Sequence, residues 1–94
     1  MLEKYIERRL VSLVKSYGGI CIKLDASLYK GIPDRMILTA TGRVKFVELK
    51  NTGKQLREVQ KVWRDKLISM GFDYEVIDSY EKVDSQKSFL TATK

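Results

Sequence analysis

Two apolar segments joined by a short turn constrain the fold of this chain more than any other feature. Residues 35–39 and 43–50 have the length and composition of β-strands, and Thr41-Gly42 between them is typical of a tight turn. We therefore expect a β-hairpin in which residues symmetric about the turn face each other. On this alignment Asp34 lies opposite Leu49.

Apolar side chains also recur at helical spacing before and after this hairpin, and a further strand-like stretch follows the second helical segment. Thr52 and Gln55 have the spacing of a capping box, which predicts the start of the second helix. The order α-β-β-β-α-β-α, with a hairpin followed by a β-α-β unit, implies an α/β (α+β) fold with a mixed sheet flanked by helices. The predicted elements are a helix at residues 2–17, strands at 20–24, 35–39, 43–50 and 74–77, a helix at 56–70 and a short last helix that Ser79 caps.

The composition restricts the possible chemistry. The chain has 94 residues, a net charge of +6, one cysteine and no histidine. We expect one domain over residues 1–94, in a cytoplasmic protein without a membrane partner, because no apolar run is long enough to span a bilayer and no signal-peptide pattern is present. The basic surplus favours polyanions, nucleic acid first. The usual zinc sites and the serine-type triad are excluded, so catalysis would rest on carboxylates, lysines, tyrosines or a hard metal ion.

Asp34, Glu48 and Lys50 form the candidate catalytic group. The hairpin brings Asp34 beside the end of the strand that carries Glu48 and Lys50, whose side chains share one face. Two carboxylates with backbone carbonyls and waters suit Mg²⁺, and a lysine beside them can stabilise a phosphoryl transition state. A Glu-x-Lys triplet by itself is usually an exposed pair. Here Val44 and Phe46 share its face, so we expect half-buried ionisable groups, which favours a functional site.

Several motifs occur in order along the chain. They are Gly31-Ile32-Pro33-Asp34-Arg35, Phe46-Val47-Glu48-Leu49-Lys50, Gly53-Lys54 before the next helix and Gln60 within it. Together they resemble the VRR-NUC family of PD-(D/E)xK nucleases, in its compact stand-alone phage and bacterial form, from Glu3 to about Val83. The resemblance implies a restriction-endonuclease-like core and a Mg²⁺-dependent DNA endonuclease for which Mn²⁺ can substitute. It also implies a homodimer that acts on four-way (Holliday) junctions or other branched DNA.

The resemblance further implies a role for each matching residue. Asp34 and Glu48 would hold the divalent metal, with the Leu49 carbonyl as a further ligand. Lys50 would be the catalytic lysine, and Gln60 would orient water or phosphate.

The first helix should supply another carboxylate, for which there are two candidates. Glu3 and Glu7 lie four residues apart and therefore on one helix face. The pattern of VRR-NUC relatives favours Glu3, whereas archaeal Holliday-junction resolvases of the same fold favour Glu7. Both remain open at this point.

Basic residues near these motifs are candidates for contacts with DNA phosphates, which position a duplex without reading its sequence. Tyr29 would stack on a base or pack within its own loop, and Trp63 is expected in the core. Arg8 and Arg9 are expected to be ordinary surface residues. The candidates for phosphate contacts are Lys23, Lys30, Arg35, Lys45 and Lys54.

Two other classes of function are compatible with the sequence. The first is a DNA-binding module that keeps the nuclease fold without activity, although a pure binder would gain nothing from paired buried acids. The second is a small accessory protein whose positive charge has no role in binding. A cleavage assay and a DNA-binding assay would separate all three functions.

Overall fold

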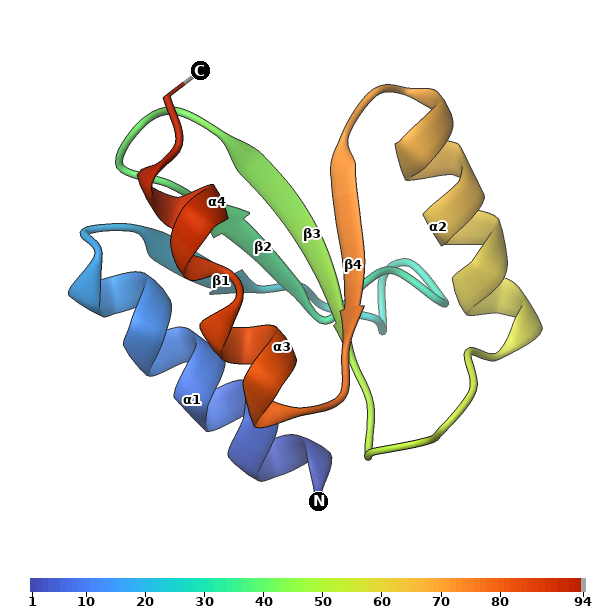
Figure 1. Cartoon of the computed structure of the whole chain (residues 1–94). Helices are drawn as coiled ribbons and strands as arrows, with labels where there is room; N and C mark the ends of the chain where they lie inside the picture. Colours follow the sequence, from blue (N-terminus) through green and yellow to red (C-terminus); the bar gives the residue numbers. More distant parts are fainter. Residues whose placement is uncertain (94) are drawn as a thin grey trace.

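The computed structural model describes residues 1–93, which form a four-stranded sheet with helices on both faces (Figure 1). The strand order is β1-β2-β3-β4; the first three strands are antiparallel and β4 runs parallel to β3. No helix within residues 1–93 combines the length and apolar character needed to cross a bilayer. The elements are α1 (Glu3–Ser16), β1 (Ile20–Lys23), β2 (Arg35–Leu38), β3 (Val44–Leu49), α2 (Glu58–Ser69), β4 (Asp73–Ile77), α3 (Tyr80–Asp84) and α4 (Lys87–Thr91).

The predicted mixed α+β fold is thus confirmed, with the last helical segment divided into two short helices. Helices α1, α3 and α4 cover one face of the sheet, and α2 covers the other (Figure 1). On the α2 face, Phe46 and Phe72 meet edge to face with ring centroids 5.5 Å apart. The main core lies on the opposite face and consists of Ile6, Leu10, Val14, Ile37, Val47, Leu49, Ile77, Val83 and Leu90.

The hairpin between β2 and β3 has a three-residue loop, not the expected two-residue turn. The Thr39 N–H donates to the Arg43 carbonyl at 2.9 Å, and the Gly42 N–H donates to the Thr39 carbonyl at 3.1 Å. Gly42 has a φ of +90°, which glycine adopts without strain. A three-residue hairpin loop that ends in such a glycine is a common connection.

This loop changes the predicted strand register by one residue. Arg35 pairs with Val47, and extending the ladder by one residue places Asp34 opposite Glu48. The predicted pairing of Asp34 with Leu49 is therefore wrong. The difference matters because directly opposed residues of antiparallel strands share a face. Asp34 and Glu48 consequently project to the same side of the sheet.

Helix α2 begins at Glu58, later than the capping box of Thr52 and Gln55 predicted. Thr52 lies in the loop between β3 and α2, where its hydroxyl donates to the carbonyl of the residue after β4 at 2.7 Å. Gln60 takes the capping role instead, because its Oε1 accepts from the Arg57 N–H at 2.8 Å. The start of α2 is thus set by a residue that was predicted to belong to the active site.

A buried polar cluster joins the sheet to the C-terminal helices. Lys45 Nζ donates to Glu75 Oε1 at 3.0 Å and to Gln86 Oε1 at 2.7 Å, and it lies 4.4 Å from the centre of the Phe89 ring. Gln86 is 1% exposed. Buried charges are stable only when paired and hydrogen-bonded. Lys45 is therefore part of the interior, and its prediction as a DNA contact is wrong.

Candidate active site

Two carboxylates meet at the edge of the sheet where β2 begins and β3 ends. Asp34 precedes β2, and its Oδ2 accepts from the Leu49 N–H at 2.7 Å, which fixes its position beside β3. Glu48 is the residue opposite Asp34, and it is only 3% exposed. The face that carries Glu48 is thus half buried, as predicted: Glu48 is buried, while Val44 and Phe46 are partly buried.

The two oxygens of Glu48 have different surroundings. Oε1 accepts from Gln60 Nε2 at 3.0 Å, whereas Oε2 is buried without a hydrogen-bond partner within residues 1–93. Several causes together raise the pKa of Glu48 to about 8: burial is the largest, the charge of Asp34 adds to it, and the charge of Lys50 acts in the opposite direction. If Glu48 is ionised, its Oε2 needs a cation or a hydrogen-bond donor that residues 1–93 do not supply.

Lys50 and Glu3 complete the group from two different elements. The Glu3 N–H donates to Asn51 Oδ1 at 2.7 Å, which ties the start of α1 to the residue after Lys50. Burial raises the pKa of Glu3, the charges of Asp34 and Glu7 add to this effect, and that of Lys50 lowers the pKa. Glu3 therefore shares its electrostatic environment with the predicted catalytic residues.

Glu7, the other candidate on the first helix, has a different partner. Its Oε2 accepts from Arg35 Nε at 2.8 Å, and Arg35 also donates to the Cys21 carbonyl at 3.1 Å. The structure thus brings Glu3 to the site and pairs Glu7 with Arg35. Arg35, a predicted phosphate contact, lies one residue after Asp34 with its charge partly compensated by Glu7.

Tyr74 was missed by sequence reasoning. Its hydroxyl is buried without a hydrogen-bond partner within residues 1–93, and burial together with the charge of Glu48 raises the pKa of Tyr74 to about 12. Tyr74 pairs with Phe46 across the parallel strands, so it belongs to the α2 face of the sheet. The only sequence signal was its place at the start of an apolar strand. Its proximity to Glu48 depends on the register across the β-α-β crossover, which local spacing does not specify.

The loop before Asp34 is attached to α2. Trp63 Nε1 donates to the Lys30 carbonyl at 2.8 Å, and the rings of Trp63 and Tyr29 meet edge to face at 6.0 Å. Gly31 has a φ of +83°, and a Cβ atom there would lie 2.6 Å from the Val59 carbonyl oxygen. Trp63 thus anchors this loop, where the sequence predicted a core position. Tyr29 packs against the anchor and remains 59% exposed.

The remaining predicted DNA contacts are accessible. Lys23 and Asp34 both line a hollow of about 480 Å³ at the surface. Lys30 and Lys54 are exposed in the loops that precede Asp34 and follow Lys50. All three cations are therefore accessible to an anionic ligand, and Lys23 shares its hollow with Asp34.

The donor atoms of this site fit a hard divalent cation. Within residues 1–93, no three His, Cys, Asp or Glu side chains are grouped so as to hold a metal. The side chains of the site thus supply only the two carboxylates of Asp34 and Glu48. The Leu49 carbonyl and waters would complete the oxygen ligands that Mg²⁺ and Mn²⁺ prefer. A cation beside Glu48 Oε2 would satisfy this unpartnered oxygen and stabilise the charged carboxylate.

Comparison with known proteins agrees with this architecture. The sequence profile of the VRR-NUC domain family matches residues 4–81. The protein named "Putative nuclease p44" of Acyrthosiphon pisum secondary endosymbiont phage 1 is 34% identical over 79 residues, which cover 84% of this chain and 85% of the phage protein. The Fanconi-associated nuclease 1 homolog of Dictyostelium discoideum is 58% identical over 33 residues, covering 35% of this chain and 3% of that protein. A solved structure of a VRR_NUC domain, 22% identical, matches with a TM-score of 0.82 over 89% of this chain and 91% of its own, which shows a common fold.

The mixed sheet, its flanking helices and the Asp34 and Glu48 carboxylates at the β2–β3 edge define a PD-(D/E)xK core. The chain belongs to the VRR-NUC domain family. The predicted family and fold are therefore confirmed, and the roles of the individual site residues remain predictions.

Proposed function

We propose that this chain is a divalent-metal-dependent DNA endonuclease that hydrolyses phosphodiester bonds in branched DNA, including four-way junctions. Membership of the VRR-NUC family and similarity to a phage protein named as a nuclease support this function. The observation that carries it is the buried Oε2 of Glu48, which has no hydrogen-bond partner in the described part of the chain and lies in a group with Asp34 and Lys50. A protein that only binds DNA gains no affinity from such a pair of acids.

Each residue of the site has a defined part in this reaction. Mg²⁺, or Mn²⁺ in its place, would polarise a phosphoryl oxygen and lower the pKa of a bound water. Asp34 and Glu48 would hold the cation together with the Leu49 carbonyl, and Gln60, which donates to Glu48 Oε1, would keep Glu48 in a fixed orientation. The ammonium group of Lys50 stabilises the negative charge that develops on the phosphoryl oxygens.

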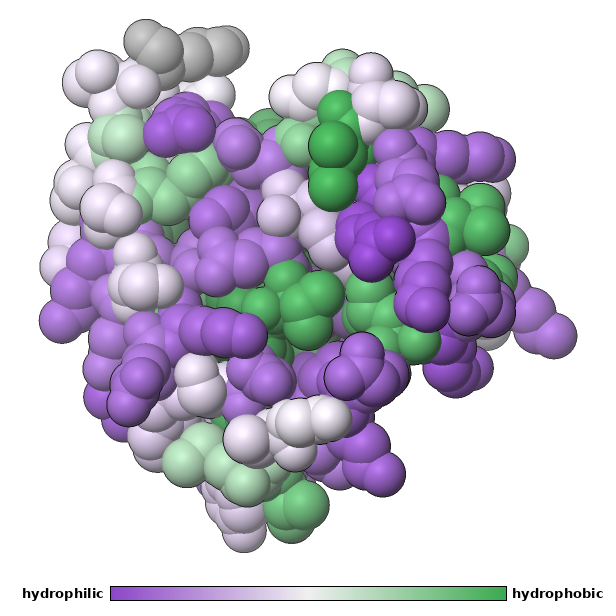
Figure 2. All heavy atoms as spheres, turned by 45° about the vertical axis from the view of Figure 1, so that its right-hand side comes forward, coloured by the Kyte–Doolittle hydropathy of each residue, from purple (hydrophilic) through white to green (hydrophobic). Residues whose placement is uncertain are grey.

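The proposed substrate implies a dimer, since a symmetric four-way junction must be cut in two strands and a C₂ dimer matches that symmetry. The face shown in Figure 2 presents several small hydrophobic patches between hydrophilic residues. Such a surface does not mark one large apolar interface on this face. Analytical ultracentrifugation at micromolar concentration is expected to give a dimer, and a monomer would overturn this part of the proposal.

A cleavage assay tests the activity itself. The wild-type protein is mixed with a labelled four-way junction or with a linear duplex of matching sequence, in Mg²⁺, in Mn²⁺ or in EDTA. Cleavage of the junction is expected with either metal and is expected to stop in EDTA. Glu48→Gln and Asp34→Asn should lose cleavage and keep DNA binding. Glu81→Gln, which changes an exposed acid on α3, is the matched control and should cut normally.

The same assay separates the other two functions. A wild-type protein that binds all the DNA forms but cuts none of them with either metal would be a DNA-binding module of nuclease fold. A protein that fails to bind DNA at low salt would be an accessory protein whose positive charge is incidental.

A further inference from the structure

A groove on the surface of α1 lies beside the candidate active site. Its volume is about 520 Å³, and we name it the α1 groove. Lys4, at one end of the groove, directly follows Glu3, whose N–H donates to Asn51 Oδ1 next to Lys50, so the groove begins beside the candidate site. It is lined by Lys4, Glu7, Arg8, Val11, Ser12 and Arg35.

The α1 groove carries a surplus of positive charge. Its one acid, Glu7, forms a salt bridge with Arg35 at 2.8 Å, whereas within residues 1–93 neither Lys4 nor Arg8 forms a salt bridge. Because both of these side chains are exposed, they are available to an anionic ligand. Two positive charges are thus left uncompensated in the groove.

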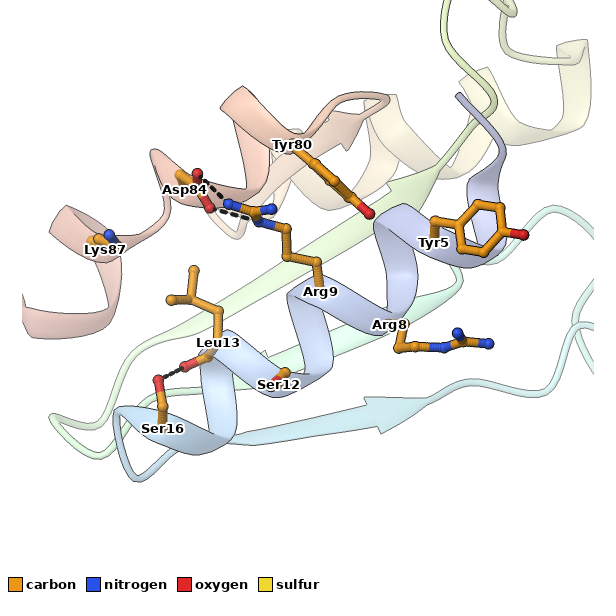
Figure 3. Close-up of a pocket in the computed structure, with 9 residues that line it drawn as sticks. All are labelled: Tyr5, Arg8, Arg9, Ser12, Leu13, Ser16, Tyr80, Asp84 and Lys87. Carbon is orange, nitrogen blue, oxygen red and sulfur yellow. Dashed lines mark hydrogen bonds and ion pairs between the residues drawn. The ribbon is translucent and has the colours of Figure 1, made fainter.

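The next residue, Arg9, shows that this is not a general property of the basic residues on α1. Arg9 donates to both carboxylate oxygens of Asp84, at 3.0 and 2.9 Å, and its guanidinium lies 4.2 Å from the centre of the Tyr80 ring. Figure 3 shows Arg9 directed toward α3, while Arg8 and Tyr5 lie together on another side of the helix. Arg9 therefore joins two helices, and Arg8 faces solvent.

Tyr5 holds the two free cations without neutralising them. Tyr5 is 42% exposed, with Lys4 Nζ at 5.1 Å and Arg8 Cζ at 5.8 Å from the centre of its ring. A cation–π contact restricts a side chain but leaves its full charge for an anion. Both cations are therefore oriented in advance beside the active site.

We propose that the α1 groove binds the DNA backbone adjoining the scissile phosphate, with Lys4 and Arg8 each contacting one phosphate and Tyr5 positioning both. This proposal rests on the proposed nuclease function, because it takes the carboxylate pair as the position of the scissile phosphate. Lys4 and Arg8 are four residues apart on α1, about 6 Å along the axis, which lies between one and two nucleotide rises of about 3.4 Å. The guanidinium of Arg8 also suits a phosphate group geometrically.

The salt dependence of DNA binding tests the two phosphate contacts. Binding of a labelled four-way junction is measured by fluorescence anisotropy in Glu48→Gln, which should not cut the DNA. Adding Lys4→Ala and Arg8→Ala should weaken binding and make the slope of log affinity against log salt less steep by about two. The matched control, Lys15→Ala with Lys66→Ala, removes the same charge from exposed positions elsewhere and should leave the slope nearly unchanged. Equal changes of slope in the two double variants would overturn the proposal.

Two variants of Tyr5 test the positioning role. Tyr5→Ala should weaken binding at every salt concentration without changing the slope, because both charges remain. Tyr5→Phe keeps the ring and should bind like the parent protein. A Tyr5→Phe variant as weak as Tyr5→Ala would remove the role assigned to the ring.

These outcomes can be told apart from failure of the nuclease proposal. If the wild-type protein never cuts DNA while only the Lys4 and Arg8 double variant changes the slope, DNA binding by the α1 groove is supported and the nuclease function is refuted. If the wild-type protein cuts DNA while both double variants change the slope equally, DNA binding by the α1 groove is refuted and the nuclease function is supported.

Discussion

The side-chain amide of Gln60 links the first turn of α2 to the carboxylate of Glu48. Its Nε2 donates to Glu48 Oε1 at 3.0 Å, while its Oε1 accepts from the Arg57 N–H at 2.8 Å. Only one orientation of an amide can satisfy both contacts, since its oxygen accepts and its nitrogen donates. The backbone of α2 therefore determines which Glu48 oxygen is occupied and which is left for a ligand.

Substitutions of Gln60 should separate this orientation from helix capping. Gln60→Glu keeps an acceptor for Arg57 but places a carboxylate oxygen against Glu48. We expect cleavage to fall by about 10-fold to 100-fold, the equivalent of about 1.5–3 kcal/mol for a hydrogen bond to a charged group. Gln60→Ala also removes the cap and should lower the free energy of unfolding by about 1–2 kcal/mol in urea titrations. Normal cleavage by Gln60→Glu would contradict this role.

The raised pKa of Glu48 should make the stability of the metal-free protein depend on pH. The ordinary pKa is 4.5, and burial, followed by the Asp34 charge, raises it to about 8 in the folded state. Between these values only the folded protein keeps the proton, so the free energy of unfolding decreases as the pH rises. The melting temperature should therefore fall from about pH 5 to about pH 8.

Glu48→Gln serves as the control for this titration, and its melting temperature should change less over the same pH range. Mg²⁺ should also reduce the pH dependence of the wild-type protein, since a bound cation favours the charged carboxylate. A melting temperature that increases over this range would contradict the assignment.

Glu3 and Glu7 should respond differently to neutralisation. Glu3→Gln is expected to reduce cleavage with little effect on stability, because Glu3 shares the electrostatic environment of Asp34 and Lys50, the candidate catalytic residues. Glu7→Gln breaks the partly buried ion pair with Arg35 and should cost about 1 kcal/mol of stability while cleavage is retained. Cleavage rates and urea titrations on both variants decide the matter, and the reverse result would make Glu7 the carboxylate of the site.

Two glycines with nearly the same backbone conformation offer a matched test of the loop anchor. Gly31 and Gly53 have φ values of +83° and +82°. Among residues 1–93, a Cβ atom at Gly31 would lie 2.6 Å from the Val59 carbonyl oxygen, whereas one at Gly53 would have no neighbour within 4 Å. Gly53→Ala should cost about 1–2 kcal/mol from backbone strain alone. Gly31→Ala should cost more, because the loop must also move away from α2. Equal losses in thermal unfolding would show that the contact with Val59 contributes nothing.

The sequence was most informative where the structure depends on local periodicity. The helices and strands were predicted close to their observed positions, and the motif spacing brought Asp34 to the end of the strand that carries Glu48. The register was wrong by one residue because Thr41-Gly42 is compatible with loops of two or three residues. Only the Thr39 and Arg43 backbone contacts distinguish these loops.

The other errors have a common origin in contacts between distant parts of the chain. The start of α2 was predicted too early because Thr52 bonds to a carbonyl beyond β4, which no local pattern reveals. Lys45 looked like a surface cation because its partners, Glu75 and Gln86, belong to elements much later in the sequence. The alternation of β3 did place Lys45 on the same face as the buried Val47 and Leu49, but it could not identify a partner for the charge.

The three-residue loop at residues 40–42 has a consequence for how this site can change in evolution. One residue more or fewer would shift the pairing of β2 with β3, and since side chains alternate along a strand, Asp34 and Glu48 would then project to opposite faces. Under the proposed function, such an insertion or deletion would abolish cleavage while every candidate catalytic residue stayed intact. A change of two residues would preserve the common face. We therefore expect the number of residues between Asp34 and Glu48 to be as strictly constrained as the two acids themselves.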